Sequence, residues 1–185
     1  MCEACGGTSS TPIAHKRALT ILRCASCGLA FVWPQPPADA VRGLYAGNAD
    51  YAITRQPELA ASPDTHARDL DLAVRPFVAA RGTLLDVGCS TGSLMYHLRA
   101  LGWSVEGVDL NEASAAIARR HGLTVHTGPA EEFDAGKAFD VVHMGDVIEH
   151  VPSPRRLLGR SRDRCRAHGC GIRRAGGRVP GGGHR

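Results

Sequence analysis

Three residues, Asp86, Gly88 and Gly92, mark a loop that could bind a charged ligand. The apolar run before them has the pattern of a strand, and leucines recur at helical spacing from residue 94 onward. Glycines let a ligand touch the backbone, and the free N–H groups at a helix N-terminus favour an anion. The Asp86 carboxylate could hold an ammonium or order water. The pattern predicts a ligand site, and a tight strand-to-helix turn without a ligand is the alternative.

Four cysteines near the N-terminus form two Cys-x-x-Cys pairs separated by 18 residues: Cys2, Cys5, Cys24 and Cys27. Four thiolates can close a tetrahedron around Zn²⁺, and each short turn lets both of its sulfurs face one ion. Gly6 and Gly28 follow these pairs, where the turn favours positive φ. Because four cysteines leave no open coordination position, we expect structural zinc in a zinc ribbon. Four reduced surface thiols are the alternative.

A second acid, Asp109, ends the strand-like run 103–109 and lies 23 residues after Asp86. This separation is close to that of the ribose-binding acid in doubly wound folds. We therefore expect the Asp109 carboxylate to accept hydrogen bonds from both ribose hydroxyls, with Leu110 against the adenine. The alternative is that Asp109, together with Asn111, caps the next helix.

Two classes of cofactor compete for the loop after Asp86. A dinucleotide fingerprint requires Gly-x-Gly-x-x-Gly, but that register contains Gly88, Ser90 and Ser93. The pattern Asp-x-Gly-x-x-x-Gly is met, and it resembles motif I of the class I S-adenosylmethionine (SAM) methyltransferases. SAM carries a carboxylate, an ammonium and a sulfonium, which suit a loop with both an acid and free N–H groups. The run Phe-Asp-Val-Val-x-x-x-x-Val-Ile-Glu-His-Val, from residue 139, resembles motif IV of the same family.

The resemblance covers about residues 84–154 and implies a SAM-dependent methyltransferase. Ala130 or Glu131 would border the adenine, although a charged helix start is the alternative there. The cofactor-binding residues that we expect are Asp86, Gly88, Cys89, Gly92, Asp109, Leu110, Ala130, Glu131, Met144 and Asp146.

Glu149 and His150, after the fourth expected strand, are the candidate acid–base pair. Methyl transfer is a displacement at a carbon already activated by the sulfonium, so the protein mainly positions the reactants. A hydroxyl, amine or acidic C–H acceptor also needs a base, and neutral histidine suits that role. A capping or packing role for His150 is the alternative. His143 belongs to no such group in the sequence, and we expect it to be structural.

The expected fold is α/β, an incomplete Rossmann-like, doubly wound parallel sheet with a small N-terminal zinc ribbon. Four strands are visible, at about residues 84–87, 103–109, 123–126 and 139–144. A helix capped by Ser62 or Asp64 is expected to reach about Arg81, with an apolar stripe of Leu70, Val74, Phe77 and Val78. The expected divisions are a zinc ribbon (1–37), a helical lead-in (38–82), a SAM-binding half domain (83–158) and a tail (159–185).

The first fifty residues also resemble a known lead-in. Short strands at 18–23 and 29–33 flank the second cysteine pair, and Pro34-Gln35-Pro36-Pro37 breaks the chain before a short helix at 39–44. The string from Cys27-Gly28-Leu29 to Leu44-Tyr45 resembles the zinc-binding lead-in of certain bacterial methyltransferases. Many of these act on sugars or other glycan precursors, which implies a small-molecule or sugar-type acceptor.

Charge is distributed unevenly along the 185 residues, whose net charge is +4. Residues 154–185 hold ten arginines and one acid, so residues 1–153 hold 12 basic and 17 acidic groups. The acidic body makes a nucleic-acid partner unexpected. No apolar run is long enough to span a membrane and no secretory signal is visible, so we expect a cytoplasmic protein. The sequence leaves the oligomeric state and the acceptor atom open.

The tail from residue 159 departs from the family pattern. It is rich in Arg, Gly, Ala and Cys, has no aromatic residue, and offers nothing that could bury a strand. Such composition is typical of GC-rich coding sequence read out of frame, and a frameshift near residue 159 is our hypothesis. It predicts that nothing from residue 159 onward is buried. A disordered tail or a basic RNA-binding arm are the alternatives.

Two other functions remain open at this point. One is an rRNA or tRNA base methyltransferase whose ribbon grips RNA, although the ribbon has few basic residues. The other is a non-catalytic zinc-ribbon interaction protein on a degenerate half domain.

Overall fold

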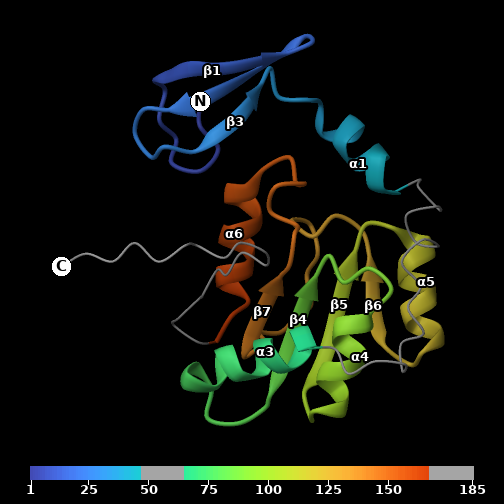
Figure 1. Cartoon of the computed structure of the whole chain (residues 1–185). Helices are drawn as coiled ribbons and strands as arrows, with labels where there is room; N and C mark the ends of the chain where they lie inside the picture. Colours follow the sequence, from blue (N-terminus) through green and yellow to red (C-terminus); the bar gives the residue numbers. More distant parts are fainter. Residues whose placement is uncertain (47–64, 167–185) are drawn as a thin grey trace.

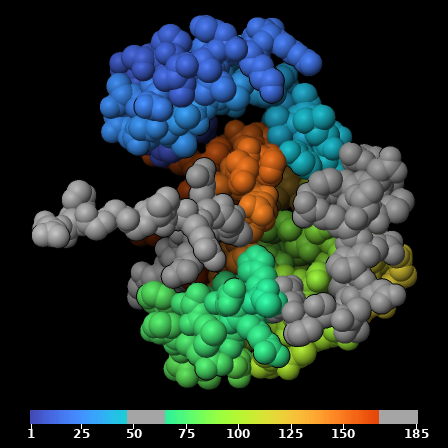
Figure 2. Space-filling model, viewed as in Figure 1, coloured from blue at the N-terminus to red at the C-terminus, as the bar shows by residue number. Residues whose placement is uncertain are grey.

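The computed structural model describes residues 1–46 and 65–166, which form two β-sheets joined through a short helix (Figure 1). A three-stranded antiparallel sheet at the N-terminus lies beyond the carboxyl ends of a four-stranded parallel sheet. The space-filling view shows this N-terminal ribbon in blue and the short helix in cyan, above the larger unit (Figure 2). No helix among the described residues has the length and apolar character needed to cross a membrane.

The N-terminal ribbon consists of β1 (Ser10–Lys16), β2 (Leu19–Cys24) and β3 (Ala30–Trp33). The two strands expected around the second cysteine pair are confirmed, whereas β1 was not expected from the sequence. The strand residues are mostly exposed, and the buried side chains of the ribbon are Cys2 and Cys24. Packing of apolar side chains therefore contributes little to this module, as expected for so small a unit.

Helix α1 (Ala38–Ala46) follows the proline-rich break and connects the ribbon with the larger unit. Its first turn closes with a hydrogen bond from Val41 N to Pro37 O, 3.1 Å long. Proline is well tolerated at a helix start, because it lacks only an N–H that would have no partner there.

The larger unit contains four parallel strands in the order β6-β5-β4-β7: β4 (Thr83–Val87), β5 (Ser104–Asp109), β6 (Thr124–Thr127) and β7 (Val141–Met144). The first strand of the unit lies in the centre and the later ones are added on both sides. This arrangement confirms the predicted Rossmann-like α/β fold with four strands.

Helices cover both faces of the parallel sheet. Leu84 of β4 packs against α3 (Thr65–Val74) and α4 (Ser93–Ala100), while α5 (Glu112–Arg120) packs against α4 and β6. The neighbouring residue Leu85 points to the opposite face and joins a cluster with Leu157 of α6 (Pro154–Asp163). Successive residues of one strand thus enter two different cores, as parallel sheets with two covered faces require.

Helix α6 continues past the point where the sequence suggested that ordered structure ends. Ser161 and Arg164 are buried, and Phe139 N donates to Arg164 O over 2.7 Å. The prediction that nothing from residue 159 onward is buried is therefore wrong for residues 159–166. Residues 167–185, to which the frameshift hypothesis also applies, lie outside the described residues.

Helix α3 is shorter than the sequence suggested. It ends at Val74 and is followed by a 3₁₀ turn (Arg75–Phe77), because Pro76 has no N–H to continue the α-helical hydrogen bonds. Phe77, expected in the apolar stripe, is 63% exposed. The expected cap at Ser62 or Asp64 lies outside the described residues.

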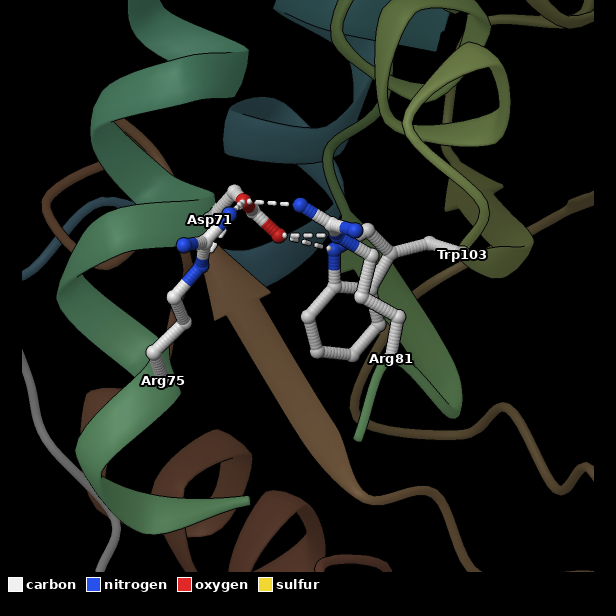
Figure 3. Close-up of polar contacts among 4 residues, drawn as sticks. All are labelled: Asp71, Arg75, Arg81 and Trp103. Carbon is white, nitrogen blue, oxygen red and sulfur yellow. Dashed lines mark hydrogen bonds and ion pairs between the residues drawn. The ribbon is translucent and has the colours of Figure 1, made fainter. Parts of the chain in front are cut away.

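One buried acid of α3, Asp71, fixes the helix against the sheet (Figure 3). Its carboxylate accepts hydrogen bonds from Trp103 Nε1 at 2.9 Å, from Arg81 Nε at 2.8 Å and from Arg75 Nη2 at 2.8 Å. Arg81, together with Trp103 and Arg75, holds the pKa of Asp71 well below its usual range. A carboxylate that is 3% exposed needs such partners, and here Trp103, Arg81 and Arg75 all donate to it.

We predict that Asp71→Asn lowers the free energy of unfolding at pH 7 by about 1–3 kcal/mol, because an amide leaves buried donors unsatisfied. Since the lowered pKa makes Asp71 stabilising only when ionised, the difference from the wild type should shrink as the pH falls below about 4. Urea unfolding at pH 7 and at about pH 3 measures this, because the stabilisation is lost below the unfolded-state pKa, with Asp69→Asn on the exposed side of α3 as the control. Equal losses in the two variants would contradict the role of Asp71.

Candidate functional site

A cavity of about 210 Å³ opens at the carboxyl ends of the parallel strands. Its wall combines the loop after β4, the end of β5, the loops after β6 and β7, and one side of α1. Ligand sites of open parallel sheets lie at this edge. The lining residues that the sequence predicted are Gly88, Asp109, Leu110, Ala130, Glu131, Asp146 and His150.

The loop after β4 depends on backbone conformations that favour glycine. Gly88 has φ +72° and donates its N–H to Val108 O over 2.8 Å, and a Cβ at Gly88 would overlap Val147 Cγ2. Gly92 has φ +81° and precedes α4, but a Cβ there would come within 2.5 Å of Leu123 Cδ1. Gly88 therefore faces the cavity as expected, whereas Gly92 is required by packing between α4 and the start of β6.

The Asp109 carboxylate, at the end of β5, binds the loop that follows β4. Its Oδ2 accepts from Ser90 N at 2.7 Å and its Oδ1 accepts from Asn111 N at 2.8 Å. Burial raises the pKa of Asp109, although the N–H groups of Asn111 and Ser90 act in the opposite direction. The helix cap itself is Asn111, whose side chain accepts from Ser114 N at 2.9 Å. Asp109 is therefore placed to meet a ligand and also to hold the loop.

Helix α1 supplies a wall that the sequence did not predict. Arg42 Nη2 donates to Glu131 Oε1 at 3.0 Å and to Glu132 Oε1 at 2.7 Å. These bonds place α1 against the loop after β6, where Glu131 is 5% exposed. The carboxylate of Glu131 is thus already bound by a side chain 89 residues away in sequence.

Tyr45, also on α1, reaches the candidate base. Its hydroxyl forms a 2.7 Å hydrogen bond with His150 Nδ1, and the two rings meet edge to face with centroids 5.3 Å apart. Tyr45 O accepts from Asn111 Nδ2 at 2.7 Å. One residue of α1 thereby contacts both the loop after β5 and the loop after β7. Leu44-Tyr45 in the lead-in was the one sequence signal for it.

Five predicted residues do not line the cavity: Asp86, Cys89, Gly92, Met144 and Glu149. Cys89 is buried beside Met95, and burial raises the pKa of its thiol well above the ordinary value. Met144 packs in the core that contains Leu157, and Glu149 is exposed. Asp86 is 3% exposed, and its Oδ1 lies 2.7 Å from His143 Nδ1. His143, which we expected to be structural only, is therefore paired with the acid of the predicted loop.

The four N-terminal cysteines come together as the sequence predicted. All four sulfurs lie within 4.8 Å of one another, with Cys2 and Cys27 at 3.7 Å and Cys5 and Cys24 at 3.6 Å. A Zn–S bond of about 2.3 Å implies a tetrahedral edge of about 3.8 Å, which these separations match. The backbone N–H of Cys27 lowers the pKa of Cys24 to about 6. The backbone N–H of Leu29 acts to lower the pKa of Cys27, but the neighbouring thiols and burial outweigh it and raise that pKa to about 12.

The two turns that carry these cysteines have the glycine conformation expected of them. Gly6 has φ +77° and Gly28 has φ +76°. Each turn is closed by a backbone bond to the first cysteine of its pair, from Gly6 N to Cys2 O and from Gly28 N to Cys24 O. The donor set and its geometry fit a four-coordinate metal ion.

Comparisons with known proteins relate the larger unit to methyltransferases. Residues 54–169 match the family described as methyltransferase domain. The ubiquinone biosynthesis O-methyltransferase of Paramagnetospirillum magneticum is 37% identical over 102 residues, which are 52% of this chain and 40% of that protein. The chain thus spans about two fifths of the length of the curated relatives that it matches.

Solved structures of similar fold include enzymes with the cofactor bound. SAM-bound CalS10, an amino pentose methyltransferase from Micromonospora echinaspora, is 26% identical, with a TM-score of 0.53 over 64% of this chain and 52% of that one. Magnesium protoporphyrin IX methyltransferase from Synechocystis PCC 6803, with bound SAM, shares the fold at 19% identity and a TM-score of 0.53, over 70% and 72% of the two chains.

We predict that Gly88→Ala destabilises the protein more than Gly136→Ala. Both glycines have positive φ, which should cost either variant roughly 1–2 kcal/mol, but a Cβ at Gly136 meets no atom within 4 Å. The additional loss in Gly88→Ala comes from overlap with Val147, so adding Val147→Ala should recover part of it. Urea unfolding of the four variants, including Val147→Ala alone, gives the coupling energy. If Gly88→Ala and Gly136→Ala lose the same free energy of unfolding, the contact with Val147 is unimportant.

Proposed function

The chain belongs to the methyltransferase domain family, and we propose that its cavity binds SAM for methyl transfer to a small molecule. The observation that carries the proposal is Asp109, whose carboxylate lies at the cavity wall 2.7 Å from the N–H of Ser90 in the glycine loop. An acid and a glycine loop joined in this way fit a nucleoside with an amino-acid end.

The lining residues suggest where each part of SAM would lie. A carboxylate offers about four lone-pair positions, so Asp109 can accept two ribose hydroxyls while it keeps its two backbone N–H groups. Leu110 and Ala130 would border the adenine. The methionine end would lie over Gly88, close to Asp86 and Asp146. This placement retains the expected cofactor side of the cavity but assigns Cys89, Gly92 and Met144 to packing.

His150 is the proposed base on the acceptor side. When bound, SAM supplies a methyl carbon that is activated by the adjacent sulfonium. If His150 Nδ1–H donates to Tyr45 Oη, the lone pair of Nε2 is left free to take the proton of an acceptor hydroxyl or amine. Tyr45 would thus orient His150. Glu149 is exposed and lies outside the cavity wall, so we propose no contact with the acceptor for it.

The relatives favour a small-molecule acceptor. One is named as an O-methyltransferase of ubiquinone biosynthesis and another as an amino pentose methyltransferase. We infer a hydroxyl- or amine-bearing small molecule or sugar, and nothing in these relatives supports RNA. A cytoplasmic location stays a prediction that rests on the absence of a visible signal in the sequence.

We also propose that the cysteine cluster binds one structural Zn²⁺. The ribbon has almost no apolar core, so a metal would supply most of its folding free energy. All four ligands would be protein thiolates, and such a closed site has no position for a substrate.

For the cofactor, we predict that Asp109→Ala weakens SAM binding by about 1.5–3 kcal/mol, or roughly tenfold to 150-fold, because the ribose loses a charged acceptor. Isothermal titration calorimetry of the zinc-loaded protein measures this. Asp134→Asn, which removes an exposed acid outside the cavity wall, is the control and should bind like the wild type. NADH should bind to none of the three proteins.

Three outcomes would count against the proposal. Tight NADH binding would overturn the choice of cofactor, and equal losses in both acid variants would show that the effect is only one of net charge. A folded, zinc-loaded wild type that does not bind SAM would instead favour the non-catalytic interaction protein.

For the metal, we predict one zinc per chain and its loss in Cys5→Ser, because serine does not replace a thiolate in a four-coordinate site. Cys165→Ser, which changes a cysteine outside the cluster, should retain the full equivalent. Elemental analysis after expression with added zinc tests both variants. A wild type without zinc, or a Cys5→Ser variant with a full equivalent, would contradict the site.

A further inference from the structure

A histidine and an aspartate form a largely buried pair between the neighbouring strands β4 and β7. Asp86 of β4 and His143 of β7 are direct partners in the strand register, and His143 Nδ1 lies 2.7 Å from Asp86 Oδ1. The side chain of His143 is 13% exposed and that of Asp86 is 5% exposed. A buried carboxylate needs a partner, and here that partner can itself carry or release a proton.

The pair lies directly behind the cavity wall. Gly145, which lines the cavity, is so close to the imidazole that a Cβ at this position would lie 3.0 Å from His143 Cε1. On the other strand, Gly88 lies two residues after Asp86 and also lines the cavity. At Gly145, therefore, no side chain stands between the His143 ring and the cavity wall, and the charge of the pair lies close to a bound ligand.

Within residues 1–46 and 65–166, three titratable groups face His143. Asp86 comes from β4, Asp146 follows β7 and lines the cavity, and His66 of α3 meets the His143 ring edge to face, with centroids 5.7 Å apart. Burial lowers the pKa of His143, but the hydrogen bond and charge of Asp86, with the charge of Asp146, outweigh it and raise the pKa above its ordinary value. Protonated His143 therefore offsets one of the two negative charges at this end of the cavity.

We propose that His143 is a positioning residue of the cofactor site: it holds the Asp86 carboxylate and gives up its proton when the SAM ammonium binds. The inference rests on the proposed function and adds to it how the methionine end is recognised. The imidazolium and the ammonium are two cations that compete for the same pair of carboxylates. Neutral His143 removes this repulsion and can still donate Nδ1–H to Asp86.

The direction of the pH dependence follows from this competition. Below the pKa of His143, SAM must displace a proton, so its affinity rises with pH, by up to about tenfold per pH unit if a whole proton is released. Above that pKa the affinity should level off. The ammonium of SAM is an α-amino group with an ordinary pKa of about 7.7–8.0, so the measurement belongs at pH 5.5–7.5, about where SAM keeps its charge.

The test is calorimetric titration of the zinc-loaded protein at several pH values, in two buffers with different ionisation enthalpies. Proton release should accompany SAM and also S-adenosylhomocysteine, which keeps the ammonium but lacks the sulfonium. Methylthioadenosine, which lacks the whole amino-acid end, should bind without proton release. This comparison of ligands needs no variant, so it does not depend on how well any substitution folds.

Two variants then assign the proton to one residue. His143→Asn keeps an N–H for Asp86 but cannot titrate, so SAM should bind to it without proton release and with a flat pH profile. His66→Asn removes the neighbouring ring but leaves His143 and Asp86 in place, so proton release should be as in the wild type. Thermal melts of both variants show whether they are folded.

The possible failures can be told apart. If wild-type SAM binding involves no proton release, or if His143→Asn releases as many protons as the wild type, His143 does not have this role. Equal release with methylthioadenosine would assign the proton to the nucleoside end and overturn the inference as well. A wild type that does not bind SAM overturns the proposed function, and the inference falls with it.

Discussion

The constraint on which the site depends is the burial of acidic side chains at the ends of neighbouring parallel strands. Asp109 can remain there because Ser90 N and Asn111 N donate to it, and Asp86 can remain because His143 donates to it. Each of these bonds joins the end of one strand to the next strand or loop. The network that satisfies the buried carboxylates is therefore also what gives the cavity its shape.

The sequence predicted the parts of this network whose partners are close in the chain. The loop from Asp86 to Gly92, the acid at Asp109 and the four-strand sheet follow from local patterns of apolar residues, glycines and strand-ending acids. The cysteine cluster was predictable for a different reason, since Cys-x-x-Cys spacing has few geometric solutions. Each of these patterns reflects a conformational or ligand requirement of a few consecutive residues. Such a requirement can be recognised in a single sequence.

The remaining contacts could not be predicted, because their partners are far apart. His143 meets Asp86 across 57 residues, Arg42 meets Glu131 across 89, and Tyr45 meets His150 across 105. The polar partners of Asp71 were missed in the same way, since Trp103 follows it by 32 residues. Gly92 was predicted to contact the cofactor because it fits the motif. In the structure, a glycine is needed at this position because a side chain would overlap Leu123.

The N-terminal ribbon lines no part of the cavity but contacts a segment that does. It contacts the segment after β7 directly, since Ser153 Oγ donates to Glu3 Oε2 over 2.9 Å. The chain then leaves the ribbon through the proline-rich break into α1, where Tyr45 bonds to His150 of the same segment. The ribbon thus reaches the loop that carries the proposed base by two routes. The shape of the cavity wall after β7 therefore depends on the positions of the ribbon and α1 as well as on the parallel sheet.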